Sequence, residues 1–338
     1  MSARTVCAVA LLILLGVAGC DDGFSPKGAI SDGAILYCVL EVQPFVERYQ
    51  VTATLTRVYD VEGFDPTTNT IDPTITRAAV ALVNGNRRYT LEETLQPRPQ
   101  GSRYPGCCWI VYQANGVPIR TLDSLHLEAI LPDGQRLSAV TSVPSYKPLT
   151  TFPAYPRGVT TRLPPLYYGS QWVINWDNNL KEDHLFFPKL RLRYRVSTSS
   201  GYLSGERDVP LRYLGEGPER QPLYPQVTSG RELAFEFAAL DESMAAISEG
   251  DSDKSRYEIL GFDFDLVEFD FALSRYYASI NGSLDQLSIR LDETVYSNIA
   301  HGYGVFGTSM ANSMLFPVNA TYAASFGYSV PLAKPAGP

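Results

Sequence analysis

Short runs of alternating apolar and polar residues begin at Ala34 and continue through most of the chain. A period of two places successive side chains on opposite faces of a strand, so each run predicts a half-buried β-strand. Asn84-Gly85 and Asp133-Gly134 predict tight hairpins, because both central residues of a type I′ turn need positive φ. Seven strands are expected in the first part of the chain, near residues 34–42, 49–59, 75–83, 87–93, 107–113, 125–131 and 136–143.

Seven short strands within about 110 residues are typical of an immunoglobulin-like β-sandwich, so residues 34–143 are predicted to form one. The segment 144–166 contains six prolines, at 144, 148, 153, 156, 164 and 165. Because proline fixes φ and lacks a backbone donor, we expect this segment to be a linker or an extended strap. Residues 167–338 are expected to form a second β-rich domain with one or two short helices, near 241–248 and 271–280. The predicted fold class is therefore all-β.

Two strands of the second domain have distinctive faces. Trp172, Ile174 and Trp176 alternate, which predicts one large apolar face. On the next strand a row of basic residues alternates with apolar ones, and it comprises Lys189, Arg191, Arg193 and Arg195. We interpret this row as a solvated face that pairs with acidic segments, with binding of an anionic ligand as the alternative. Long loops expected at 60–74, 214–228 and 310–317 are further candidate binding surfaces.

The N-terminus has the pattern of an export signal. Arg4 precedes an apolar run at 6–15, and small residues lead to Cys20. The run is too short for a membrane helix, which needs roughly 20 residues. Val17-Ala18-Gly19-Cys20 resembles the lipobox of bacterial lipoproteins, in which cleavage precedes an acylated cysteine. The resemblance implies a signal peptide at 1–19, a lipid anchor at Cys20 and a tether at 20–33. The alternative is an ordinary secretory signal with an incidental cysteine.

Net charge and cysteine count restrict the class of partner and the disulfides that this chain can form. The chain has a net charge of −8, which argues against nucleic acid as a partner. Of its five cysteines, Cys38, Cys107 and Cys108 remain once the signal and the anchor are set aside. In an oxidising compartment we expect one disulfide from Cys38 to Cys107 or Cys108, and a strained bridge between the two adjacent cysteines is the alternative.

One segment matches the sequence of a known catalytic motif. Gly307-Thr308-Ser309-Met310-Ala311 matches the serine signature of subtilisin-like proteases. That chemistry needs a histidine base and an orienting aspartate, and the three histidines of this chain lack the context of that family. We therefore predict no catalytic residue. A secreted hydrolase using Ser309, or the carboxylates of Asp263 and Asp265, is the alternative. Metal-ligand spacings and dinucleotide or phosphate-loop motifs are also missing, so no cofactor is expected.

Four segments resemble a family of uncharacterised Bacteroidota-type lipoproteins that are often encoded beside TonB-dependent receptors. They are the lipobox, residues 35–40, residues 78–83 and, most specifically, residues 295–299 followed by Gly302-Tyr303-Gly304-Val305-Phe306-Gly307. The resemblance implies a lipid-anchored protein of the cell envelope, at the outer membrane, with a binding or assembly role accessory to such a receptor. The family has no known catalytic residues to transfer. A purely structural surface lipoprotein is the remaining alternative.

Overall fold

The computed structural model describes residues 33–58, 70–98, 100–152, 171–176, 184–215, 217–281 and 296–331. Strands dominate these residues, with three short α-helices, so the fold is all-β as predicted. The predicted signal peptide, Cys20 and nearly all of the tether lie outside the described residues, as do residues 153–170 of the proline-rich segment.

The first lobe contains the seven predicted strands. They are β1 (Ala34–Val42), β2 (Arg48–Arg57), β3 (Ala79–Asn84), β4 (Arg87–Pro97), β5 (Cys108–Pro118), β6 (Ser124–Ile130) and β7 (Arg136–Ser142). The start of β4 pairs with β3, and its later part, from Glu92 onward, pairs with β5. Strand β4 therefore joins β2 and β5 to β3, β6 and β7, and all seven strands belong to one hydrogen-bonded sheet of eleven strands. Gly85 and Gly134 have φ of 58° and 90°, as the hairpin motifs require.

The second lobe is built from two sheets with aromatic side chains between them. The larger sheet contributes β10 (Phe186–Thr198), β11 (Gly201–Asp208) and β15 (Tyr257–Phe269), and the smaller contains β8 (Leu149–Phe152), β9 (Gln171–Trp176) and β14 (Glu232–Glu236). Trp172, Ile174 and Trp176 on β9 are all buried, which confirms the predicted apolar face. Trp172 packs edge-on against Phe316 with ring centroids 4.9 Å apart. Strand β8 lies within the predicted proline-rich linker.

Smaller elements complete this lobe. Helix α2 (Phe237–Ala246) and helix α4 (Ala320–Ser325) supply buried side chains to the second core. Strands β12 (Arg212–Leu214) and β13 (Gln221–Leu223) form a separate pair, and single 3₁₀ turns occupy Gly217–Glu219 and Lys254–Arg256. Helix α3 (Phe271–Asn281) matches the predicted helix at 271–280.

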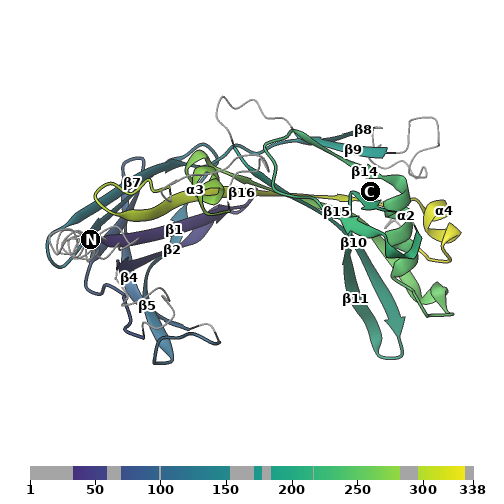
Figure 1. The fold of residues 1–338 in the computed structure, drawn as a ribbon, viewed down its shortest axis with the longest axis horizontal. Coiled ribbons are helices and arrows are strands. Elements are labelled where there is room, and N and C mark those ends of the chain that lie inside the picture. Colours follow the sequence, from purple (N-terminus) through teal and green to yellow (C-terminus); the bar gives the residue numbers. More distant parts are fainter. Residues whose placement is uncertain are drawn as a thin grey trace, which may run out of the picture.

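One long strand joins the two lobes. In β16 (Tyr303–Phe316), residues 303–310 run parallel to β1, and residues 309–316 run antiparallel to β15. Phe306 and Met310 belong to the first core, whereas Phe316 belongs to the second. Figure 1 shows β16 running between the lobes, which lie at the two ends of an elongated molecule.

The shared strand differs from the division expected from the sequence. The predicted second domain begins at residue 167, yet its last strand completes the first lobe. A bridge between Ser138 and Ala300 also connects the segment before β16 to β7. The physical reason is burial, because Phe306 and Met310 pack among the apolar side chains of the first core. Residues 310–316, expected as part of a loop, form the second half of this strand.

The expected disulfide from Cys38 is not formed, since all three described cysteines are free thiols. Cys38 points into the first core with 1% of its surface exposed, whereas Cys107 is exposed beside the start of β5. Burial raises the pKa of the Cys38 thiol to about 12. The sulfur atoms of the adjacent Cys107 and Cys108 lie 2.6 Å apart.

Candidate binding cleft

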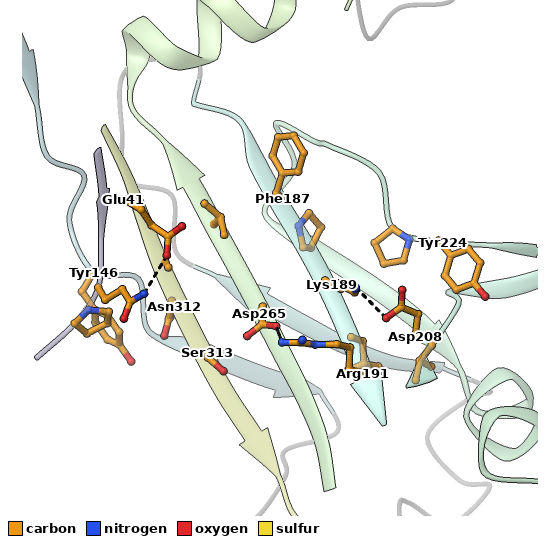
Figure 2. A pocket seen from close by; sticks show the side chains of 18 of the residues that line it. Glu41, Tyr146, Phe187, Lys189, Arg191, Asp208, Tyr224, Asp265, Asn312 and Ser313 are labelled. Atoms are coloured by element: carbon orange, nitrogen blue, oxygen red, sulfur yellow. Dashed lines mark hydrogen bonds and ion pairs between the residues drawn. The ribbon is translucent and has the colours of Figure 1, made fainter. Parts of the chain in front are cut away.

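A cleft of about 880 Å³ lies where the end of β1 meets β10, β15 and β16. Figure 2 shows side chains from both lobes around it. Its volume is typical of small-ligand sites, which range from roughly 300 to 1,000 Å³. The residues that line it include Glu41, Phe45, Tyr146, Phe187, Lys189, Arg191, Asp208, Tyr224, Asp265, Asn312 and Ser313.

Three aromatic side chains of the cleft are exposed. The side chain of Phe45 is fully exposed, and Tyr146 and Tyr224 keep 47% and 41% of their surface accessible. Most large apolar side chains lose such exposure on folding, so a group of them around a hollow is typical of a contact surface. Tyr224 lies in the loop 214–228, which was expected as a candidate binding surface, whereas the sequence pattern did not single out Phe45 or Tyr146. A further signal was an aromatic residue beside a proline, as in Pro44-Phe45 and Tyr224-Pro225.

The turn that carries Phe45 is held in a strained conformation. Phe45 has φ of 72°, which costs a non-glycine residue on the order of 1–3 kcal/mol. The buried Tyr49 fixes this turn: its hydroxyl accepts a hydrogen bond from the Gln43 amide at 3.1 Å. The same oxygen lies 2.9 Å from the carbonyl oxygens of Gln43 and Val46. Phe45 is therefore presented to solvent by a rigid turn.

The floor of the cleft carries charged side chains, and each cation there is paired with a carboxylate. Lys189 Nζ lies 3.0 Å from Asp208 Oδ1, and Arg191 forms an ion pair with Asp265. The predicted basic row thus faces acidic residues of β11 and β15, and Figure 2 shows the two pairs side by side. Farther along β10, Arg193 and Arg195 pair with Asp263 and Glu258, each at 2.6 Å. With its cations already paired, this face favours a polar, uncharged or zwitterionic contact over an anion.

A buried polar network lies next to the cleft at the junction of the lobes. His184 Nδ1 lies 2.9 Å from Glu268 Oε1, and Lys147 Nζ lies 3.9 Å from the same oxygen. All three residues are buried. Asn312, which lines the cleft, donates to the carbonyl oxygen of Lys147 at 2.6 Å. Buried charges are tolerated only when paired, so this network fixes the segments that form the cleft.

Asp270 connects three further elements of the junction. Its Oδ1 accepts from the Leu273 amide at 2.7 Å and so caps helix α3. Its Oδ2 accepts from the Thr308 amide on β16 at 2.7 Å and from the Thr141 hydroxyl on β7. Burial raises the pKa of Asp270 above 3.8, although these hydrogen bonds act in the opposite direction. The carboxylate therefore ties α3, β16 and the first lobe together.

The structure places Ser309 inside β16 rather than at the start of a helix. Its side chain is buried, with 4% exposed, and it lies opposite Phe269 on β15. The subtilisin-type serine needs a histidine within hydrogen-bond reach. Among the described residues, Ser309 forms no hydrogen bond to a histidine. The alternative carboxylates, Asp263 and Asp265, are held in the ion pairs with arginines of β10.

Comparison with known proteins adds no relatives. No family model matches the chain, and no curated protein is similar to it. Within the described residues, no helix has the length and apolar character needed to cross a membrane. The same residues contain no cluster of three or more His, Cys, Asp or Glu side chains suited to a metal ion.

Proposed function

We propose that this protein is a lipid-anchored component of the cell envelope with a binding or assembly role. In this proposal Cys20 carries the lipid, and the protein is an accessory to a TonB-dependent receptor of the outer membrane. The lipobox-like sequence supports the anchor, and the family resemblance supports the receptor. The proposal includes no catalytic step.

The observation that carries the binding role is the cleft with its exposed aromatic rim. Energetically dominant contacts in protein interfaces are enriched in aromatic residues and arginine that enter pockets of the partner. Phe45, Tyr146 and Tyr224 supply such groups from both lobes. Because the turn around Phe45 is already rigid, its immobilisation costs little on binding. The shared strand and the buried network likewise hold the two sides of the cleft at a fixed separation.

Fractionation tests the anchor. Cys20→Ala should release the protein from membranes and abolish incorporation of labelled fatty acid, because single-site dual or triple acylation is what retains it. Retention of the variant equal to that of the wild type would contradict the lipid anchor.

Affinity purification tests the partner. Gentle crosslinking followed by purification from solubilised outer membranes should recover one β-barrel receptor reproducibly. Deletion of the gene should impair growth on one particular nutrient. Recovery of no β-barrel protein, together with unchanged growth, would favour the purely structural lipoprotein.

A further inference from the structure

A second cavity, of about 300 Å³, lies at one end of the first lobe. Three arginines line it, Arg48, Arg87 and Arg120, together with Glu47. We call it the arginine pocket. It is separate from the aromatic cleft in its lining residues, and nothing in the binding role proposed above requires it.

Local structure brings these arginines together. Arg48 begins β2 and lies opposite Pro118 at the end of β5, where the register of the two strands shifts. Gly116 in this irregular region has φ of 70°, and its carbonyl oxygen accepts from Arg48 Nη1 at 3.2 Å. Such irregularities re-aim side chains, and the contact with Gly116 holds Arg48 at the pocket. Arg87 follows the Asn84-Gly85 hairpin into the same region.

A hydrogen-bonded network holds the segment of the pocket that carries Arg120. Asn84 Nδ2 donates to the Pro118 carbonyl oxygen at 3.1 Å and to Asp123 Oδ2 at 2.7 Å. The same carboxylate oxygen accepts from the Arg120 amide at 2.9 Å. The Asp123 carboxylate is therefore engaged in holding the loop, and the pocket does not depend on a mobile segment for its shape.

The charges of the pocket are not compensated. Among the described residues, the guanidinium groups of Arg48, Arg87 and Arg120 form no ion pair with a carboxylate. This contrasts with β10, whose four cations each have an acidic partner. All three arginines are exposed, so solvent screens their repulsion, yet they line one pocket of an otherwise acidic protein. Counting Glu47, the lining keeps two net positive charges.

We propose that the arginine pocket binds the phosphate group of a soluble ligand. A phosphate monoester carries a charge of about −1.5 to −2 at pH 7, which balances the pocket. The planar fork of arginine is suited to bidentate hydrogen bonds with phosphate oxygens.

A lipid headgroup offers the same phosphate chemistry, so the test below includes vesicles of stated composition that distinguish a headgroup from a soluble ligand.

Thermal unfolding of the full-length, detergent-solubilised protein tests the site with inorganic phosphate as the probe. Phosphate at 100 times its Kd should raise Tm by roughly 5 °C relative to chloride of equal ionic strength. Arg87→Gln should weaken phosphate binding roughly tenfold or more, because a charge-assisted contact is lost. Its Tm without phosphate should stay close to that of the wild type, because Arg87 is exposed and forms no ion pair among the described residues.

Arg88→Gln is the matched control. Arg88 is the next residue on β4, points to the opposite face and pairs with Glu128, so this variant should keep the phosphate response. Arg48→Gln provides a second test from a different strand and should behave as Arg87→Gln.

Three results would overturn the proposal. One is the lack of a phosphate-specific rise in Tm, and another is an equal loss in Arg87→Gln and Arg88→Gln. The third is Arg87-dependent flotation with vesicles of phosphatidylcholine and phosphatidylglycerol, over vesicles of phosphatidylcholine alone, without a response to inorganic phosphate. That third result would assign the pocket to a membrane headgroup.

Discussion

Replacement of Asp270 by asparagine tests the junction of the lobes. Both carboxylate oxygens accept a backbone N–H, Oδ1 from Leu273 and Oδ2 from Thr308, each at 2.7 Å. An asparagine side chain offers only one oxygen, so in either orientation its NH₂ group faces a buried backbone donor. A buried donor without a partner costs about 1–3 kcal/mol. Asp270→Asn should therefore lower the free energy of unfolding by about 2 kcal/mol at neutral pH.

The pH dependence of this loss provides a sharper test. Burial raises the pKa of Asp270 in the folded protein above 3.8, so the folded state binds its proton more tightly than the unfolded state does. The stability that protonation contributes is present below pH 3.8 and is lost as pH rises through the folded pKa. Asp270→Asn lacks this titration. The difference in stability between wild type and variant should therefore be larger under acidic conditions than at neutral pH.

Urea unfolding followed by tryptophan fluorescence at a series of pH values measures both effects. Thr141→Val is the control, because it removes one hydroxyl donor to Asp270 but leaves the carboxyl group to titrate. A loss below about 0.5 kcal/mol in Asp270→Asn, which is typical of surface changes, would refute the argument. A difference that shrinks on acidification would refute the sign of the pKa shift.

Three further predictions concern other parts of the chain. Gly304→Ala should destabilise the protein by at least about 1–2 kcal/mol, because φ of Gly304 is 110° and an added Cβ would overlap a backbone carbonyl of β1. Calorimetry should show both lobes melting in one transition at a lower temperature. In the native protein Cys38 should resist alkylation because it is buried, whereas Cys107 and Cys108 should react or link to each other, as mass spectrometry of non-reduced peptides will show. A fluorophosphonate probe should leave the protein unlabelled, and labelling that disappears in Ser309→Ala would revive the hydrolase alternative.

The strands of the first lobe could be predicted because their signals are local. Alternation sets which face is buried, and Asn84-Gly85 and Asp133-Gly134 set two of the turns. The aromatic face of β9 followed from the spacing of Trp172 and Trp176 in the same way. Each of these signals lies within one strand or one hairpin.

The path of β16 could not be predicted from such signals. Its parallel pairing with β1 joins residues more than 260 positions apart, such as Ile35 and Tyr303. Parallel strands are not connected by a hairpin turn, so no local sequence motif predicts this pairing. Its second half, which includes Ser313, also reads as a loop because small polar residues interrupt the apolar ones. The cleft was missed for a related reason, because the exposure of Phe45 depends on how two lobes and one turn are placed.

Site-specific photocrosslinking from Phe45 tests most directly whether the cleft is the partner-binding surface. A photoreactive phenylalanine analogue at position 45 should crosslink in intact cells to one β-barrel outer-membrane protein. The same analogue at Leu95, which is also exposed on β4, at 69% against 100% for Phe45, but lies outside the cleft, should yield little of that product. The account predicts a β-barrel adduct from position 45 and almost none from position 95. Equal adducts from both positions, or none from position 45, would contradict the account.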